Sequence, residues 1–431
     1  MKDVIEQRLS GKDILILGYG REGHATLKEL EKYIPAEHIT IADANPDSIP
    51  AEIKQNFRTI SGEDYCKGLD KYDIIIKTPG ISDSKLADVD KTKVTSQTDL
   101  FLQCYNNQTI GITGTKGKST TSSLIYHLLK QSGQKAVLVG NIGIPAFCEL
   151  DKISKDSIIV MELSAHQLQH LHKAPHIAVF LNIYEEHLDY FGTFNKYYDA
   201  KCNIFLKQQS GDILITDLTI PDIASKLSDY HNKIIDYGKN PNAIGGNLQG
   251  KHNLKNIAAA IEVAKLYNIA NDIISNSILN FAPLPHRLEY VGIFEDIIFY
   301  NDSISTIPEA AIAAIEAIGN IDSIILGGFD RGINYNRLCK YLIHSELNNI
   351  ILIGQAGERI GEILEEKGCD KSIYHADKMI DVVNYAFGNT TKGKVCLLSP
   401  AASSYDMFKN FEDRGNKYKE LIVNHKKNTD E

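Results

Sequence analysis

The chain has 431 residues, of which 23% are charged and 43% hydrophobic, and its formal net charge is −9 at pH 7. This length exceeds one ordinary core and predicts about three domains, and the composition is that of a globular protein rather than a disordered or fibrous one. The negative charge argues against bulk binding of nucleic acid or of an anionic membrane. The start lacks a secretory pattern, and no apolar run approaches the roughly 20 residues of a membrane span, so we expect a cytoplasmic protein. The seven cysteines form no CxxC pair, which argues against a disulfide framework or a structural zinc site.

Apolar runs of strand length alternate with segments of helix length along the chain. The expected strands are 13–18, 38–43, 72–77, 108–113, 135–140, 157–162, 177–182, 323–328, 349–354 and 394–398. This alternation predicts an α/β fold with parallel sheets and helices on both faces, and ligands bind at the carboxyl ends of such strands. The polar residues 106–108 and the helix-stopping Pro283 and Pro285 predict two joints. We therefore expect domains at residues 1–105, 106–283 and 284–431.

A glycine-rich turn, Gly18-Tyr19-Gly20-Arg21-Glu22-Gly23, follows the first expected strand and opens a helix. Its glycines permit a tight turn and a close backbone approach, and the helix start attracts a pyrophosphate. Asp43, at the end of the next strand, can accept a hydrogen bond from a ribose or a base. On these residues alone, a nicotinamide or flavin enzyme and a plain tight turn both remain open.

The most informative local motif lies between the strand that ends at residue 113 and the helix that follows. It consists of Thr113, Gly114, Thr115, Lys116, Gly117, Lys118, Ser119 and Thr120. In such a loop the backbone N–H groups surround phosphates, a lysine meets the β- and γ-phosphates, and a hydroxyl holds Mg²⁺. Ile112 stands where a strict phosphate-loop motif has its first glycine, yet the position and chemistry still predict a phosphate loop.

Acidic residues follow two later strands. Glu162 ends one expected strand, and the run Glu185-Glu186-His187-Leu188-Asp189 follows another. Because Mg²⁺ prefers oxygen ligands and keeps several waters, one carboxylate beside a phosphate loop is enough to begin a site. A lone His187 is more often a satisfied histidine, but its acidic neighbours keep a functional role open.

Ten segments, taken together and in this order, resemble the Mur ligase family over essentially the whole chain. They are TGTKGKST (113–120), NIGIP (141–145), ELS with HQL (162–168), NIYEEHLD (182–189), AK (200–201), GKHNLKNIAAA (250–260), HRLE (286–289), NDS (301–303), LGG (326–328) and LSPAASSYDMFKNFEDRG (398–415). The resemblance implies a Rossmann-like first domain for a UDP substrate, a central ATPase domain and a C-terminal α/β domain for the amino acid. The last segment is similar to that of the members that add glutamate to UDP-N-acetylmuramoyl-L-alanine.

The resemblance also implies residue roles for ATP, two Mg²⁺ ions and the other substrates. Lys118 would stabilise the phosphates, Ser119 and Glu162 would hold one Mg²⁺, and His187 would help to hold a second. The other implied nucleotide contacts are Asn253, Asn256, Arg287 and Asp302. The implied contacts to the UDP substrate are Gly18, Tyr19, Gly20, Asp43, Thr78, Pro79, Gly80, Asn141 and Glu186. The implied glutamate contacts are Arg331, Ser404 and Phe411.

Lys201 has two interpretations. On sequence alone it is a surface-facing helix residue, whereas the resemblance implies a lysine carbamylated by CO₂, whose new negative charge would help to hold a Mg²⁺ ion. The expected reaction is ATP-dependent addition of glutamate, in its D form, through an acyl phosphate in peptidoglycan precursor synthesis, by a monomer that acts on small molecules. Two alternatives are a ligase of the same fold for L-glutamate or another acceptor, and a nucleotide-binding subunit without catalysis.

Overall fold

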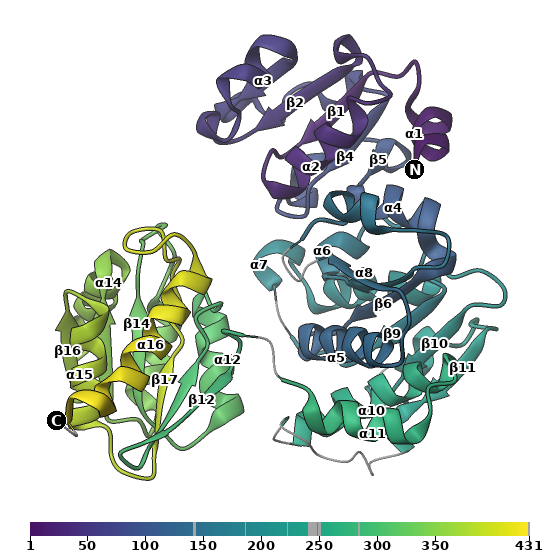
Figure 1. Ribbon diagram of the computed structural model, residues 1–431. Helices are drawn as coiled ribbons and strands as arrows, with labels where there is room; N and C mark the ends of the chain where they lie inside the picture. The colour runs from purple at the N-terminus through teal and green to yellow at the C-terminus, as the bar shows by residue number, and fades with distance from the viewer. Residues whose placement is uncertain are drawn as a thin grey trace. The chain divides into compact units, whose positions relative to one another are not determined.

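The computed structural model describes residues 1–140, 144–185, 187–221, 223–239, 248, 251–282 and 285–429. The chain divides into two compact units, Met1–Phe281 and Ala282–Glu431. The first unit holds two parallel sheets and the second holds one mixed sheet (Figure 1). The α/β fold predicted from the alternating strands is therefore confirmed, whereas the domain boundary near Tyr105 lies within the first unit and stays a prediction.

The first sheet has the strand order β3-β2-β1-β4-β5, with all neighbours parallel. Its strands are β1 (Ile14–Leu17), β2 (Ile39–Asp43), β3 (Arg58–Ser61), β4 (Ile74–Lys77) and β5 (Val94–Thr95). The accompanying helices are α1 (Lys2–Leu9), α2 (Arg21–Leu30), α3 (Ala51–Asn56) and α4 (Gln97–Tyr105). Ile14 and Ile16 face one core, while Leu15 and Leu17 face the other, as the two-residue period of a strand requires.

The second sheet has the order β11-β10-β9-β6-β8-β7 and is also parallel. Its strands are β6 (Thr109–Thr113), β7 (Ala136–Gly140), β8 (Ile158–Glu162), β9 (Ile177–Phe180), β10 (Ile213–Thr216) and β11 (Lys233–Asp236). The helices are α5 (Lys118–Gln131), α6 (Ala165–Leu168), α7 (Leu188–Phe191), α8 (Phe194–Leu206), α9 (Ile223–Lys226), α10 (Lys251–Leu266) and α11 (Asn271–Asn280).

Buried strand residues divide the second sheet between two cores. Ile112 and Val160 pack with residues of α5, α10 and α11, whereas Met161 and Phe180 pack with residues of α6 and α8 on the opposite face (Figure 1). The second of these cores also contains Phe101 of α4 and Ile16 of β1. The two sheets of the first unit therefore share one hydrophobic core, and Lys77 at the end of β4 donates a hydrogen bond to Tyr190 of α7.

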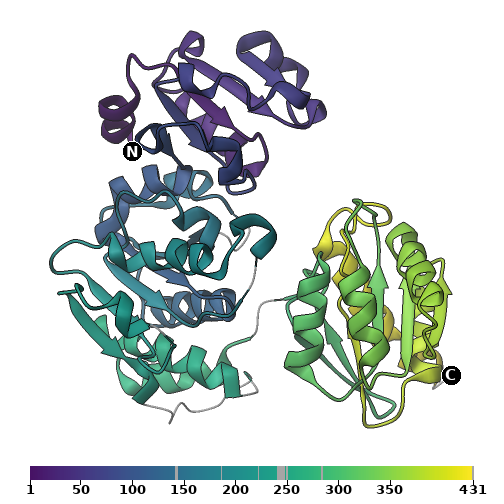
Figure 2. The ribbon, with the colours of Figure 1, turned by 180° about the vertical axis from the view of Figure 1, so that it is seen from behind.

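The second unit contains one sheet in the order β12-β13-β17-β14-β15-β16, in which only β12 runs antiparallel to its neighbour. The strands are β12 (Glu289–Phe294), β13 (Ile297–Asn301), β14 (Ile321–Gly327), β15 (Asn349–Ile353), β16 (Ser372–Ala376) and β17 (Val395–Leu398). The helices are α12 (Pro308–Ile318), α13 (Asn336–His344), α14 (Gly354–Glu366), α15 (Met379–Asn389) and α16 (Phe411–Thr429). Residues of α12, α13 and α14 share one core with the sheet, and residues of α15 and α16 share the other (Figure 2).

None of the described helices is long and apolar enough to cross a bilayer. Helix α11 ends at Asn280, shortly before the proline-rich segment, as the sequence predicted. Pro283 and Leu284 lie outside the described residues.

Candidate active site

The phosphate loop joins the carboxyl end of β6 to the start of α5, as the motif predicted. Gly117 precedes the helix with φ 86°, a left-handed conformation that favours glycine. A Cβ atom at Gly117 would also lie 2.3 Å from Oδ1 of Asn256 on α10. The loop therefore needs glycine for both its backbone conformation and its packing. Asn256 in turn donates a hydrogen bond to Asn253 at 3.0 Å, so both implied nucleotide contacts stand next to the loop.

Two lysine ammonium groups converge on this loop. Lys118, the first residue of α5, donates hydrogen bonds to the carbonyl oxygens of Gly114 and Thr115, each at 3.0 Å. Lys201 of α8 donates to the Gly114 carbonyl at 2.8 Å, and its side chain is 1% exposed. The interpretation of Lys201 as a surface residue is therefore wrong, because α8 turns this position inward onto β6. Two positive charges in so small a volume favour an anionic ligand.

Two residues that the sequence analysis did not single out hold the loop in place. The hydroxyl groups of Tyr197 and Thr115 share a hydrogen bond at 3.1 Å, and the ring of Tyr197 lies 4.9 Å from the ammonium of Lys201. Asn182 accepts a hydrogen bond from the backbone N–H of Lys116 at 2.8 Å and donates one to its carbonyl at 2.9 Å. The spacing of four residues between Tyr197 and Lys201 was the available signal, since such residues share a helix face.

Glu162, at the end of β8, is a buried acidic residue on the strand next to β6. It pairs in register with Ile112, and its side chain is 1% exposed. Ser119, in the first turn of α5, is 2% exposed. A carboxylate and a hydroxyl beside a phosphate loop are oxygen ligands that fit Mg²⁺, with water and phosphate oxygens as its other ligands. Among the residues described, no three His, Cys, Asp or Glu side chains form a group that could bind a metal on its own.

His187 adopts a left-handed backbone conformation, with φ 57°, immediately before α7. Its ring centroid is 5.0 Å from that of His166 on α6. Burial, together with the nearby His187, Lys77, Lys201 and Lys118, lowers the pKa of His166 to about 3. His166 therefore stays neutral at pH 7, and three lysine ammonium groups lie close enough to influence it.

The glycine-rich turn of the first sheet forms a second part of the site. A Cβ atom at Gly18, whose φ is 97°, would lie 2.0 Å from Oγ1 of Thr78, so the two implied substrate loops touch. Asp43 accepts hydrogen bonds from the backbone N–H of Tyr19 at 2.6 Å and of Asn45 at 2.8 Å. Asp43 thus fixes the turn itself. Gly20 follows at the N-cap of α2, and Pro79 and Gly80 follow Thr78 at the end of β4.

The second unit carries two implied nucleotide contacts, Asp302 and Arg287, and the implied glutamate contacts. Asp302, 3% exposed, accepts hydrogen bonds from Ser305 at 2.5 Å and Ser399 at 2.9 Å, and from the backbone N–H of Leu288 at 3.1 Å. Burial raises the pKa of Asp302 to about 6, against the lowering effect of these hydrogen bonds. Arg287 directly precedes Leu288 in the chain and is partly exposed.

The implied glutamate contacts differ in exposure. Ser404 is 3% exposed, and Phe411, which opens α16, is partly buried. Arg331 is exposed and donates a hydrogen bond to the Thr306 carbonyl at 3.0 Å. Asn141 and Glu186, both implied contacts of the UDP substrate, lie outside the described residues.

Arg414 is a buried residue of this unit that the sequence analysis passed over. Its guanidinium, 2% exposed, donates hydrogen bonds to the Ser303 hydroxyl and to the carbonyls of Ser303, Gly327, Ala402 and Ser403. The group therefore ties together three loops at the carboxyl ends of β13, β14 and β17. Its only signal in the sequence was its place within the motif at residues 398–415.

A parallel sheet with a phosphate loop, an inward-facing lysine pair and a buried carboxylate defines a nucleotide-binding α/β enzyme. Residues 112–247 match the Mur ligase middle domain. The UDP-N-acetylmuramoylalanine–D-glutamate ligase of Acetivibrio thermocellus is 30% identical over 97% of this chain and 97% of its own. The enzyme of the same name from Geobacillus kaustophilus is 34% identical over 93% and 95% of the two chains. The chain belongs to the Mur ligase family.

Solved structures support the fold. A MurF structure from Acinetobacter baumannii has a TM-score of 0.57 at 16% identity and covers 98% of each chain. MurF from Thermotoga maritima, solved in complex with ADP, has a TM-score of 0.55 at 17% identity over 99% of this chain and 100% of its own. These likenesses confirm the three-domain ligase architecture as a fold.

Proposed function

We propose that this chain is an ATP-dependent ligase that joins D-glutamate to UDP-N-acetylmuramoyl-L-alanine in peptidoglycan precursor synthesis, and thus serves cell-wall growth and division. The observation that carries the proposal is the pair of lysines on the Gly114 carbonyl inside a phosphate loop. The nearly full-length likeness to ligases of this name supports the choice of substrates.

The reaction needs two steps because a carboxylate does not expel an oxide ion at neutral pH. An oxygen of the alanyl carboxylate attacks the γ-phosphorus of ATP, and ADP leaves with the electron pair of the broken P–O bond. The glutamate nitrogen then attacks the acyl carbon of the acyl phosphate, inorganic phosphate leaves, and the nitrogen loses a proton. Catalysis of phosphoryl transfer rests mainly on positioning and on neutralising charge.

In this proposal the phosphate loop binds ATP. The backbone of Gly114 to Thr120 surrounds the phosphates, and the Lys118 ammonium leaves its two carbonyl partners to contact the β- and γ-phosphates. Asn253 and Asn256 stand beside the loop on α10. Arg287 and Asp302 are the contacts that the second unit would add.

Mg²⁺ belongs to the same proposal, with Ser119 and Glu162 as ligands of one ion and His187 as a ligand of a second. Bound there, the ions would neutralise charge on the phosphate oxygens. Lys201 contributes to the second site only as a carbamate, because an ammonium repels a cation. Glu162 stands at the end of a buried strand and is 1% exposed, so the fold shields its carboxylate from water and fixes its orientation.

The first sheet would hold the UDP part of the acceptor. Gly18, Tyr19 and Gly20 would approach its diphosphate at the start of α2, and Thr78, Pro79 and Gly80 would line the same ligand. Ser404, Phe411 and Arg331 would hold glutamate. A cytoplasmic location and a monomeric state complete the proposal.

The test measures phosphate release from ATP by the purified chain with UDP-N-acetylmuramoyl-L-alanine and each glutamate enantiomer in turn. We expect release with D-glutamate and little with L-glutamate. A preference for L-glutamate would support a ligase of other specificity, and no release with either would support a nucleotide-binding subunit. Lys118→Ala should lower the rate about 100-fold or more, since it removes a preorganised charge at the transferring group. Lys130→Ala, at the other end of α5, is the matched control.

A further inference from the structure

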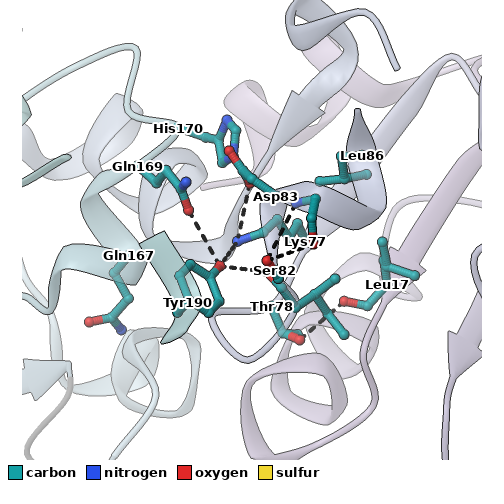
Figure 3. A network of polar contacts seen from close by, with 12 residues as sticks. Leu17, Lys77, Thr78, Ser82, Asp83, Leu86, Gln167, Gln169, His170 and Tyr190 are labelled. Carbon is teal, nitrogen blue, oxygen red and sulfur yellow. Dashed lines mark hydrogen bonds and ion pairs between the residues drawn. The ribbon is translucent and has the colours of Figure 1, made fainter. Parts of the chain in front are cut away.

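We propose that Tyr190 is a positioning residue. It holds the substrate loop, residues 78–81, and the His187 segment, residues 187–191, in fixed positions relative to each other. The inference rests on the proposed function and deepens it, since it concerns how the acceptor site and the metal site are kept aligned. Figure 3 shows the Tyr190 hydroxyl beside Lys77 and Gln169, and Asp83 beside His170.

The phenol of Tyr190 reaches from α7 to the loop that follows β4. Its hydroxyl donates a hydrogen bond to the Ile81 carbonyl at 2.5 Å and accepts one from the Lys77 ammonium at 2.9 Å. Ile81 closes a turn on Thr78 through a backbone hydrogen bond of 3.2 Å. Tyr190 therefore fixes the last residue of the loop implied to bind the UDP substrate.

The same residue anchors His187. Helix α7 is a single turn of four residues, which does not persist without tertiary contacts. The backbone N–H groups of Tyr190 and Phe191 donate to the His187 carbonyl at 3.1 and 3.0 Å. The left-handed backbone of His187 costs about 1 kcal/mol or more in a residue other than glycine, so its surroundings must hold it. The ring of Tyr190 lies 4.2 Å from that of His166, and its hydroxyl bonds to Ile81 and Lys77 tie this single turn to the loop after β4.

Burial of Lys77 makes loss of its hydrogen bond to the Tyr190 hydroxyl energetically unfavourable. Its side chain is 3% exposed, and a carboxylate oxygen of Asp83 is 3.9 Å away, beyond hydrogen-bond distance. Burial lowers the pKa of Lys77 to about 8. A buried ammonium needs hydrogen-bond acceptors, and the Tyr190 hydroxyl is one of them. Loss of this hydroxyl would leave both Lys77 and the Ile81 carbonyl short of a partner.

A second side-chain contact, between His170 and Asp83, also holds the chain that follows β4. His170, just after α6, contacts the Asp83 carboxylate at 2.8 Å. Burial tends to raise the pKa of Asp83, but the hydrogen bond and charge of His170 outweigh it and bring the pKa below its usual range. This pair ties the segment after Ile81 to the segment that follows α6, so Tyr190 acts on a loop that is already held at its far end.

The first test measures hydrogen exchange of the free, full-length chain, which needs no turnover. In Tyr190→Phe, the peptides that cover residues 78–86 and 187–192 should both exchange about 10-fold faster, as expected for the loss of one hydrogen bond to a charged network. The control is Tyr230→Phe, which removes a hydroxyl of the same unit that donates a hydrogen bond to Gln208 at 2.6 Å. It should leave the exchange rates of both peptides unchanged. Unchanged exchange in Tyr190→Phe, or faster exchange in one peptide alone, would overturn the inference.

The second test uses kinetics of the same variants. We expect Tyr190→Phe to raise the KM for UDP-N-acetylmuramoyl-L-alanine about 10-fold and to leave the KM for ATP within about 2-fold. Its melting temperature should fall slightly, because buried Lys77 and the Ile81 carbonyl lose a partner. Equal changes in both KM values would assign Tyr190 a general structural role and overturn the inference. If the parent chain shows no turnover, the proposed function is contradicted. The inference about Tyr190 is then still decided by hydrogen exchange, which needs no turnover.

Discussion

Lys118 and Lys201 donate hydrogen bonds to the same carbonyl oxygen, that of Gly114, at 3.0 and 2.8 Å. Two ammonium groups that share one acceptor repel each other, and the repulsion is large in a buried site. The arrangement is stable only if neighbouring dipoles or an anion compensate it. Carbamylation of Lys201 would reverse the sign of its charge and turn this repulsion into attraction.

We therefore predict that Lys201→Ala lowers kcat about 100-fold, since it removes a charged group aligned with the phosphate loop. Activity should recover in part when bicarbonate or a short carboxylate is added. The control is Lys196→Ala, an exposed lysine of the same helix. If Lys201→Ala turns over like the parent in ordinary buffer, or if removal of CO₂ does not slow the parent, the carbamate hypothesis is wrong.

Gly18 offers a test of the acceptor site. Alanine at this position would place its Cβ 2.0 Å from the Thr78 hydroxyl at φ 97°, so it must displace the loop. We predict that Gly18→Ala weakens binding of UDP to the full chain at least 10-fold, measured by calorimetry. Gly62→Ala controls for backbone strain, because its φ is 75° with open space around it. Micromolar binding of NAD without UDP binding to the parent would support a dinucleotide enzyme instead.

Arg414 offers a test of the glutamate site. Lysine keeps the positive charge but cannot reproduce a planar fork that serves three loops. We predict that Arg414→Lys raises the KM for glutamate about 10-fold, changes the KM for ATP less than 2-fold, and lowers the free energy of unfolding by about 1–3 kcal/mol. Arg337→Lys, on the exposed face of α13, should change none of these quantities. Equal KM values in parent and variant would show that Arg414 stabilises the unit without positioning glutamate.

The sequence predicted the phosphate loop because its requirements are local. A strand end, a left-handed glycine, a lysine and hydroxyls fall within eight consecutive residues, and each leaves a recognisable residue type. The bond from Tyr190 to Ile81 joins residues 109 apart, and that from Arg414 to Ser303 joins residues 111 apart. No local pattern reports such pairings, since they depend on how sheets pack. The burial of Lys201 was missed for the same reason.

The last prediction concerns pH. Burial raises the pKa of Asp302 from 3.8 to about 6, so between these values the folded chain binds more protons than the unfolded chain. The free energy of unfolding must then fall as pH rises from about 4 to 6, by about 3 kcal/mol for this group. Asp302→Asn cannot ionise and should lose that part of the pH dependence, whereas Asp370→Asn, which changes an exposed carboxyl, should keep it. Urea unfolding of the parent and both variants at pH 4, 5, 6 and 7 measures the difference. The same slope in the parent and Asp302→Asn would mean that Asp302 is ionised throughout this range.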